Sequence, residues 1–155
     1  MMKTLVVAAF AVCLLGSCSN SSNESSAEST TSADPVSELE AGVMASHDST
    51  MAHMDDIMRL KKAVRKKLAV TDSLMKSGKK DAALQTDHEQ GESIANNLNA
   101  AEKGMMDWMH GYSVDTLKKL DQQKAMEYLK AEKAKIDKVN ELTKKSLADA
   151  ASYVQ

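Results

Sequence analysis

The chain has 155 residues and a formal net charge of −2 at pH 7, with 27% charged and 3% aromatic residues. Because Lys and Arg are interleaved with Asp and Glu, no basic patch indicates nucleic acid or acidic lipid as a partner. The sequence shows no Gly-rich phosphate loop, no Ser/His/Asp set and no nucleophilic cysteine motif, so we do not expect an enzyme.

The first 18 residues have the pattern of a lipoprotein export signal. A basic tip at Lys3 precedes an apolar run from Thr4 to Leu15, which is too short to span a bilayer. The tetrad Leu15-Gly16-Ser17-Cys18 resembles the bacterial lipobox, which implies removal of residues 1–17 and lipidation of Cys18. The alternative is an ordinary signal peptide, cut nearby, that leaves Cys18 as a free thiol. We therefore expect a lipid-anchored cell-envelope protein, at the outer membrane facing the periplasm or the surface, with the leaflet left open.

Residues 18–34 are predicted to be a disordered tether. From Ser19 to Ala33 the chain consists almost entirely of Ser, Thr, Asn, Glu and Ala. Such a segment cannot bury enough apolar surface to offset the entropy lost on ordering. A flexible chain of this length would hold the following domain on the order of 20–25 Å from the membrane.

A long helix is predicted over residues 37–76. Apolar or near-apolar residues recur at steps of three and four from Val43 to Met75, which places them along one side of a helix. Ser37 and Glu40 have the spacing of a capping box. A second apolar row widens the stripe, so this helix is expected to face two neighbours.

Two further helices are predicted over residues 81–110 and 121–153. Both keep apolar steps of three and four, although polar residues thin the middle of the first one, where Gly91 is a poor helix former. Asp121 is the expected N-cap of the last helix. Residues 35–155 are therefore predicted to form an all-α, up-down-up antiparallel three-helix bundle with coiled-coil-like packing. The alternative is a coiled-coil oligomer that uses the same stripes between chains.

Histidines and methionines are concentrated in two stretches that face each other if the first two helices fold back at Gly78. The resulting cluster contains His47, Met51, Met105, Met109 and His110. Thioether and imidazole ligands suit Cu(I) better than hard cations, so the cluster indicates a soft-metal site. Two other interpretations stay open: the methionines fill the core, or they line a groove for an apolar ligand or a partner helix.

Three tripeptides are similar to the Asp-Ser/Thr-apolar pattern of periplasmic protein O-glycosylation in Bacteroidota. They are Asp48-Ser49-Thr50, Asp72-Ser73-Leu74 and Asp115-Thr116-Leu117. The pattern predicts glycans on Ser49, Ser73 and Thr116, which must then lie at the surface. The alternative is that these pairs serve only as helix caps.

Three separated motifs occur in order within residues 43–150. They are His47-Asp48-x-x-Met51-x-x-Met54-Asp55-x-Ile57-Met58, Met106-Asp107-Trp108-Met109-His110 and Tyr128-Leu129-x-x-x-Lys133-x-Lys135-Ile136. Together they resemble a group of uncharacterised Bacteroidota lipoproteins, some of which carry the label viral A-type inclusion protein. The resemblance implies helical repeats and supplies no catalytic residue.

The sequence thus predicts a non-catalytic envelope lipoprotein whose helical part is a binding or structural module for an unidentified envelope protein. The alternative is a copper-binding protein that uses the His/Met cluster. The two hypotheses differ in a measurable way, because packing methionines tolerate exchange for leucine and ligand methionines do not.

Overall fold

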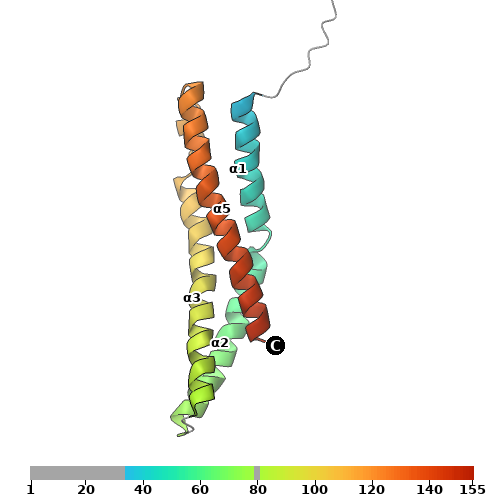
Figure 1. The fold of residues 1–155 in the computed structure, drawn as a ribbon, viewed down its shortest axis with the longest axis vertical. Coiled ribbons are helices and arrows are strands. Elements are labelled where there is room, and N and C mark those ends of the chain that lie inside the picture. Colours follow the sequence, from blue (N-terminus) through green and yellow to red (C-terminus); the bar gives the residue numbers. More distant parts are fainter. Residues whose placement is uncertain (1–33, 79–80) are drawn as a thin grey trace, which may run out of the picture. The chain divides into compact units, whose positions relative to one another are not determined.

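The computed structural model describes residues 34–78 and 81–155 (Figure 1). Its helices are α1 (Pro35–Met51), α2 (Met54–Lys76), α3 (Ala82–Gly111), α4 (Val114–Leu117) and α5 (Gln122–Tyr153). The described residues contain no β-strand, so the predicted all-α class is confirmed. None of these helices is long and apolar enough to cross a membrane. The predicted signal peptide, Cys18 and the tether as far as residue 33 lie outside the described residues.

Short polar side chains precede four of the helices. Asp34, Asp81, Ser113 and Asp121 stand before α1, α3, α4 and α5, and each accepts a hydrogen bond from a backbone amide of the first turn. These amides have no partner inside their own helix, so the caps determine where the helices begin. Gly78 follows α2 with a φ of 90°, a left-handed conformation that glycine adopts without steric cost.

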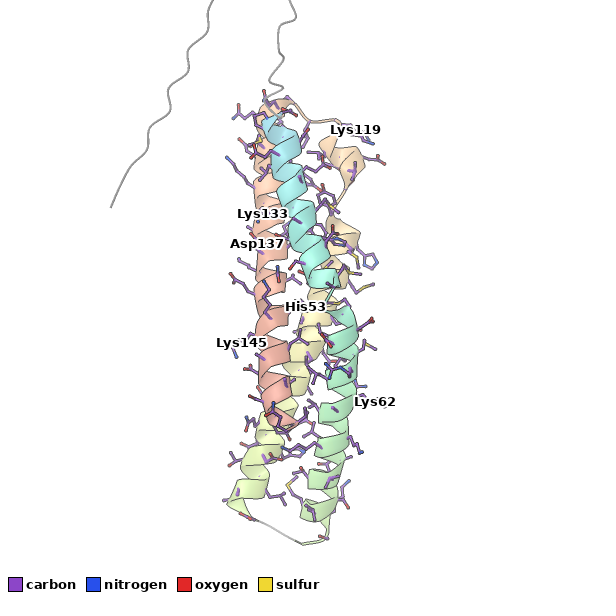
Figure 2. The ribbon with its side chains drawn as sticks, turned by 90° about the vertical axis from the view of Figure 1, so that its right-hand side faces the viewer. His53, Lys62, Lys119, Lys133, Asp137 and Lys145 are labelled. Atoms are coloured by element: carbon purple, nitrogen blue, oxygen red, sulfur yellow. The ribbon has the colours of Figure 1, made fainter. Side chains whose placement is uncertain are left out.

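The first predicted helix, over residues 37–76, is not continuous, and this prediction was wrong. Ala52 and His53 separate α1 from α2, at the junction where Figure 2 labels His53. Thr50 is fully buried, and its hydroxyl donates to the carbonyl of Ser46 at 2.8 Å, a bond that tends to bend helices. The amide of His53 then donates to the carbonyl of Thr50, three residues back instead of four. The apolar spacing continues through the break, which is why it predicted a single helix.

Helix α5 runs in the same direction as α1 and α2 and packs against both (Figure 1). Ser46 of α1 donates to Asp137 of α5 at 2.6 Å. Further along both helices, Lys67 of α2 donates to the carbonyl of Tyr153 at 2.7 Å. One helix therefore spans the break and holds the two shorter helices in place.

Helix α3 runs in the opposite direction and packs against α2 and α5. His88, early in α3, pairs with Asp72 in the last third of α2 at 2.8 Å. Glu102, later in α3, pairs with Lys61 nearer the start of α2. The order of these two pairs gives the antiparallel direction of α2 and α3.

The interior contains two apolar clusters, one on each side of the break. The α2 core consists of Ile57, Leu60, Val64, Leu68, Ile94, Leu98, Ala101, Ala150 and Tyr153. The α1 core consists of Val43, Met105, Trp108, Leu117, Ala125, Leu129 and Ile136. Met54 packs against both clusters and connects them. Fully burying one large apolar side chain contributes about 1.5–3 kcal/mol, so both cores contribute to the stability of the fold.

Helix α5 places polar side chains in the interior between the two cores. Thr143 and Ser146 are buried, and within the described residues their hydroxyl groups and the side-chain oxygen of Asn140 have no hydrogen-bond partner. Ser46 and Asp137, which contact each other, are 91 positions apart. The same offset places the segment from Asn140 to Ser146 beside the break. The break therefore lies next to the buried side-chain oxygen atoms of Asn140, Thr143 and Ser146.

A polar cluster joins α1 to α5 about one turn before this segment, where Figure 2 labels Lys133 and Asp137. The ammonium group of Lys133 lies 2.9 and 2.8 Å from the two carboxylate oxygens of Asp137 and 3.3 Å from the hydroxyl of Ser46. The hydrogen bonds from Lys133 and then from Ser46 hold the pKa of Asp137 below its usual range.

We expect Asp137→Asn to lower the free energy of unfolding by about 0.5–1 kcal/mol at pH 7, because water screens this partly exposed pair. The pKa of Asp137 is lower in the folded chain than in the unfolded one, so its carboxylate stabilises the fold above the unfolded pKa of about 3.9. This contribution is lost as the pH falls through the folded pKa. In urea unfolding between about pH 7 and pH 2, the difference between wild type and variant should therefore shrink toward zero. Asp149→Asn, which breaks a pair within α5 alone, is the control, and an equal effect of both variants would contradict a role in holding α1 on α5.

Candidate functional site

His47 and Met51 lie one turn apart on the same side of α1. His47 is partly buried, and its ring centroid lies 5.4 Å from that of Trp108 on α3. Met51 is 39% exposed. Because residues four positions apart share a helix face, both side chains lie on the flank of α1 next to α3.

The ring of His47 is held by the carboxylate that follows it in the sequence. Its Nδ1 lies 2.8 Å from Oδ1 of Asp48. When the ionised carboxylate accepts a hydrogen bond from Nδ1–H, the lone pair of the neutral ring is on Nε2. A carboxylate in this position commonly orients an imidazole that binds a metal ion through its other nitrogen. Nε2 of His47 is therefore suited to act as a ligand.

The methionines of α3 divide between the core and the surface. The predicted ligand Met105 is fully buried in the α1 core, whereas the next residue, Met106, is 46% exposed. Met109 packs partly against the same core, and His110 is exposed in the last turn of α3. One step along a helix rotates the side chain by about 100°, so Met105 and Met106 face different surroundings.

Two contacts align α3 with α1 and α2 on either side of this region. His47 lies against Trp108, and Lys61 pairs with Glu102. Met51 lies between His47 and Lys61 in the sequence, and α3 runs opposite to α1 and α2. Met51 therefore lies across from the stretch of α3 between Glu102 and Trp108. The surface methionines of α3 occur in this stretch or directly after it. We call this surface the His/Met face; it consists of His47, Met51, Met106 and Met109.

An aromatic row supports this face from the inside. Trp108 stacks on Tyr112 with ring centroids 5.0 Å apart, and Tyr112 stacks on Tyr128 of α5 at 6.1 Å. The indole N–H of Trp108 donates to the carbonyl of Glu132, and the Tyr112 hydroxyl donates to Glu40 of α1. Burial, followed by the charge of Glu40, raises the pKa of Tyr112 to about 12. The sequence signal for this row was the four-residue spacing of Trp108 and Tyr112 on one helix.

The three predicted glycosylation sites lie on separate helices. Ser49 in α1, Ser73 in α2 and Thr116 in α4 are all exposed, as a glycan requires. The hydroxyl of Thr116 lies 3.1 Å from that of Ser113, the cap of α4. Glycosylation of these residues and lipidation of Cys18 stay predictions.

A surface pocket of about 520 Å³ lies where α1, α4 and α5 meet. Its apolar lining residues are Val36, Val114, Leu117, Leu120 and Ala125. The charged residues around them are Asp34, Glu40 and Lys118. Sequence periodicity gave no indication of this pocket, because three separate segments form it.

In the described part of the chain, the side chains that most often bind metal ions, His, Cys, Asp and Glu, do not form a metal site. Within residues 34–78 and 81–155, no group of three or more His, Cys, Asp or Glu side chains is arranged to hold a metal ion. The His/Met face offers donors of another type, the thioether sulfur atoms of its methionines.

These observations define the class of protein: an all-α protein whose long helices pack around two apolar cores, with histidine and methionine on one face. Comparison of the chain with protein-family models, with curated proteins and with solved structures gave no match. The function therefore has to be inferred from the sequence motifs and from the geometry of the site.

Proposed function

We propose that this protein is a lipid-anchored lipoprotein of the cell envelope whose helical part is a non-catalytic binding or structural module. The tetrad Leu15-Gly16-Ser17-Cys18, which resembles a lipobox, carries the proposal. Cleavage before Cys18 and acylation of its thiol attach the chain to a membrane, most simply the outer membrane.

The helices support a role as a folded module and not only as a spacer. The pair α1–α2, then α3, then α5 are compatible with the three arms of the up-down-up bundle, with coiled-coil-like packing, that we propose. Both apolar cores are built from residues within 34–155, so this part carries its own source of stability. The polar segment from Ser19 to Ala33 has the composition of a flexible tether. The three motifs that resemble Bacteroidota lipoproteins agree with an envelope location.

We propose that the partner of this module is another protein of the cell envelope. Interleaved charges and a net charge of −2 argue against nucleic acid, because they offer no continuous positive surface to phosphates. The membrane is contacted through the lipid. An oligomer built from the same helix stripes remains an alternative arrangement.

Metabolic labelling with a palmitate analogue tests the lipid anchor, in a bacterial host that expresses the full chain. The wild type should carry the label, fractionate with membranes and have Cys18 as its mature N-terminus in mass spectrometry. Cys18→Ser should lose the label. Cys13→Ser is the matched control, because it removes the other cysteine, from inside the predicted signal peptide, and should keep the label. Label that survives Cys18→Ser, or a mature chain with a free Cys18 thiol, would overturn the proposal.

A further inference from the structure

We propose that the His/Met face binds one soft monovalent metal ion, with Cu(I) as the ion that its donor atoms fit best. The ligands are Nε2 of His47 and the sulfur atoms of Met51, Met106 and Met109. This set differs from the one that spacing predicted, because Met106 takes the place of the buried Met105 and His110 is not required. The inference goes beyond membrane anchoring and does not depend on it.

Exposure distinguishes Met51 and Met106 from ordinary core residues. A methionine that only fills space is buried among apolar neighbours, as Met105 is. Met51 and Met106 instead leave large fractions of their surface open to solvent. The exposed part of an apolar side chain adds no stability through burial, so packing alone does not explain these two methionines. Their thioethers can therefore be reached by an ion from solution without opening the core.

Helix geometry places the α3 ligands on the flank that faces α2. His88 and Glu102 of α3 mark this flank, because both form ion pairs with α2. Met106 and Met109 follow Glu102 by four and seven positions, spacings that return to the same helix face. The side chains of Met106 and Met109 thus lie on the side of α3 that contacts α2.

The α1 ligands face the same place from the other side. The 5.4 Å contact of His47 with Trp108 shows which flank of α1 faces α3, and Met51 is one turn further along it. Asp48 holds Nδ1 of the His47 ring, which leaves the Nε2 lone pair for a ligand bond. Two helices that are distant in sequence thus supply one imidazole and three thioethers.

The donor atoms select the class of ion. Thioether sulfur is a soft, neutral ligand that favours Cu(I), whereas Mg²⁺ and Ca²⁺ require several oxygen ligands. Neutral donors also leave the single positive charge of the ion in place. The carboxylate of Asp48 contacts Nδ1, the other nitrogen of the His47 ring. It therefore compensates part of this charge without binding the metal.

Anaerobic titration of the purified full chain with Cu(I), in competition with a colorimetric chelator, tests the site. The wild type should take one equivalent of Cu(I) from the chelator, and Met51→Leu/Met106→Leu should weaken binding roughly 100-fold. Met75→Leu/Met126→Leu is the matched control, because it makes the same chemical change at the end of α2 and in the first turns of α5. The control should alter the affinity less than about threefold, since leucine replaces methionine with little change in volume.

Two further readouts separate ligation from a general effect on the fold. Trp108 is the only tryptophan and contacts His47, so its fluorescence should be quenched on binding and level off at one equivalent. Circular dichroism should show the double variant as folded as its control. Met105→Leu should leave the affinity unchanged. The proposal is overturned if the wild type cannot compete with the chelator, if the double variant binds like the control, or if Met105→Leu abolishes binding; none of these results bears on Cys18 acylation.

Discussion

Replacing Trp108 with alanine is expected to lower the free energy of unfolding by about 3–5 kcal/mol. The indole is 94% buried in the α1 core, where it stacks on Tyr112 and contacts the ring of His47. Its N–H also donates to the carbonyl of Glu132 at 3.3 Å. Alanine would leave a cavity lined by these groups and a buried carbonyl without its side-chain donor, and both effects destabilise the folded state.

Urea unfolding followed by circular dichroism measures this loss, because the variant has no tryptophan to report by fluorescence. Trp108→Phe is the matched control, since it keeps an aromatic ring and removes the N–H donor. We expect the phenylalanine variant to lose about 1–2 kcal/mol, well below the alanine variant. A loss of less than about 1 kcal/mol for Trp108→Ala would show that the α1 core does not depend on this residue.

Long-range helical spacing was enough to predict the three long helical segments but not the interruption in the first one. The stripe from Val43 to Met75 has no Pro, no Gly and no missing apolar step at Ala52 and His53. The break instead accompanies the buried hydroxyl of Thr50, which bonds back to Ser46. Whether such a hydroxyl turns to its own helix or to a neighbour depends on tertiary packing, so local sequence could not decide it.

The same limit applies to the His/Met cluster. Folding the first two helices about Gly78 correctly brought α1 and the end of α3 to face each other, because loop position and helix rise determine that register. The choice between Met105 and Met106 depends on a rotation of about 100° around the axis of α3. That rotation follows from how α3 divides its contacts between α2 and α5, and a sequence with apolar residues at both positions does not reveal it.

Gly91 shows how tertiary contacts can reverse a helix propensity. In the middle of a helix, glycine is about 1 kcal/mol less favourable than alanine, and Gly91 weakened the prediction of this segment for that reason. In the structure, a Cβ at Gly91 would lie 2.7 Å from Cδ2 of Leu68 and 2.8 Å from Cζ of Tyr153, both far inside normal contact distance. Glycine is therefore required where α3 approaches α2 and α5.

The two side chains that a Cβ would displace have little freedom to move. The Tyr153 hydroxyl donates to the backbone carbonyl of Asp87 at 3.1 Å, and the ammonium of Lys67 lies 4.0 Å from its ring centroid. Burial, and then the charge of Asp87, raises the pKa of Tyr153 to about 12, so the phenol stays neutral and keeps its proton for the bond to Asp87. Leu68 belongs to the α2 core. Any shift that admits a methyl group would strain this core or break one of these bonds.

We therefore expect Gly91→Ala to lower the free energy of unfolding by about 1–3 kcal/mol, because the overpacking outweighs the gain in helix propensity. Gly42→Ala is the matched control, since a Cβ there would meet only Cε and Cδ of Lys133, at 3.7 and 3.8 Å. That variant should be up to about 1 kcal/mol more stable than the wild type. Thermal and urea unfolding of both variants decides the question: if Gly91→Ala is as stable as Gly42→Ala, the three helices do not meet at Gly91 as closely as the structure has them.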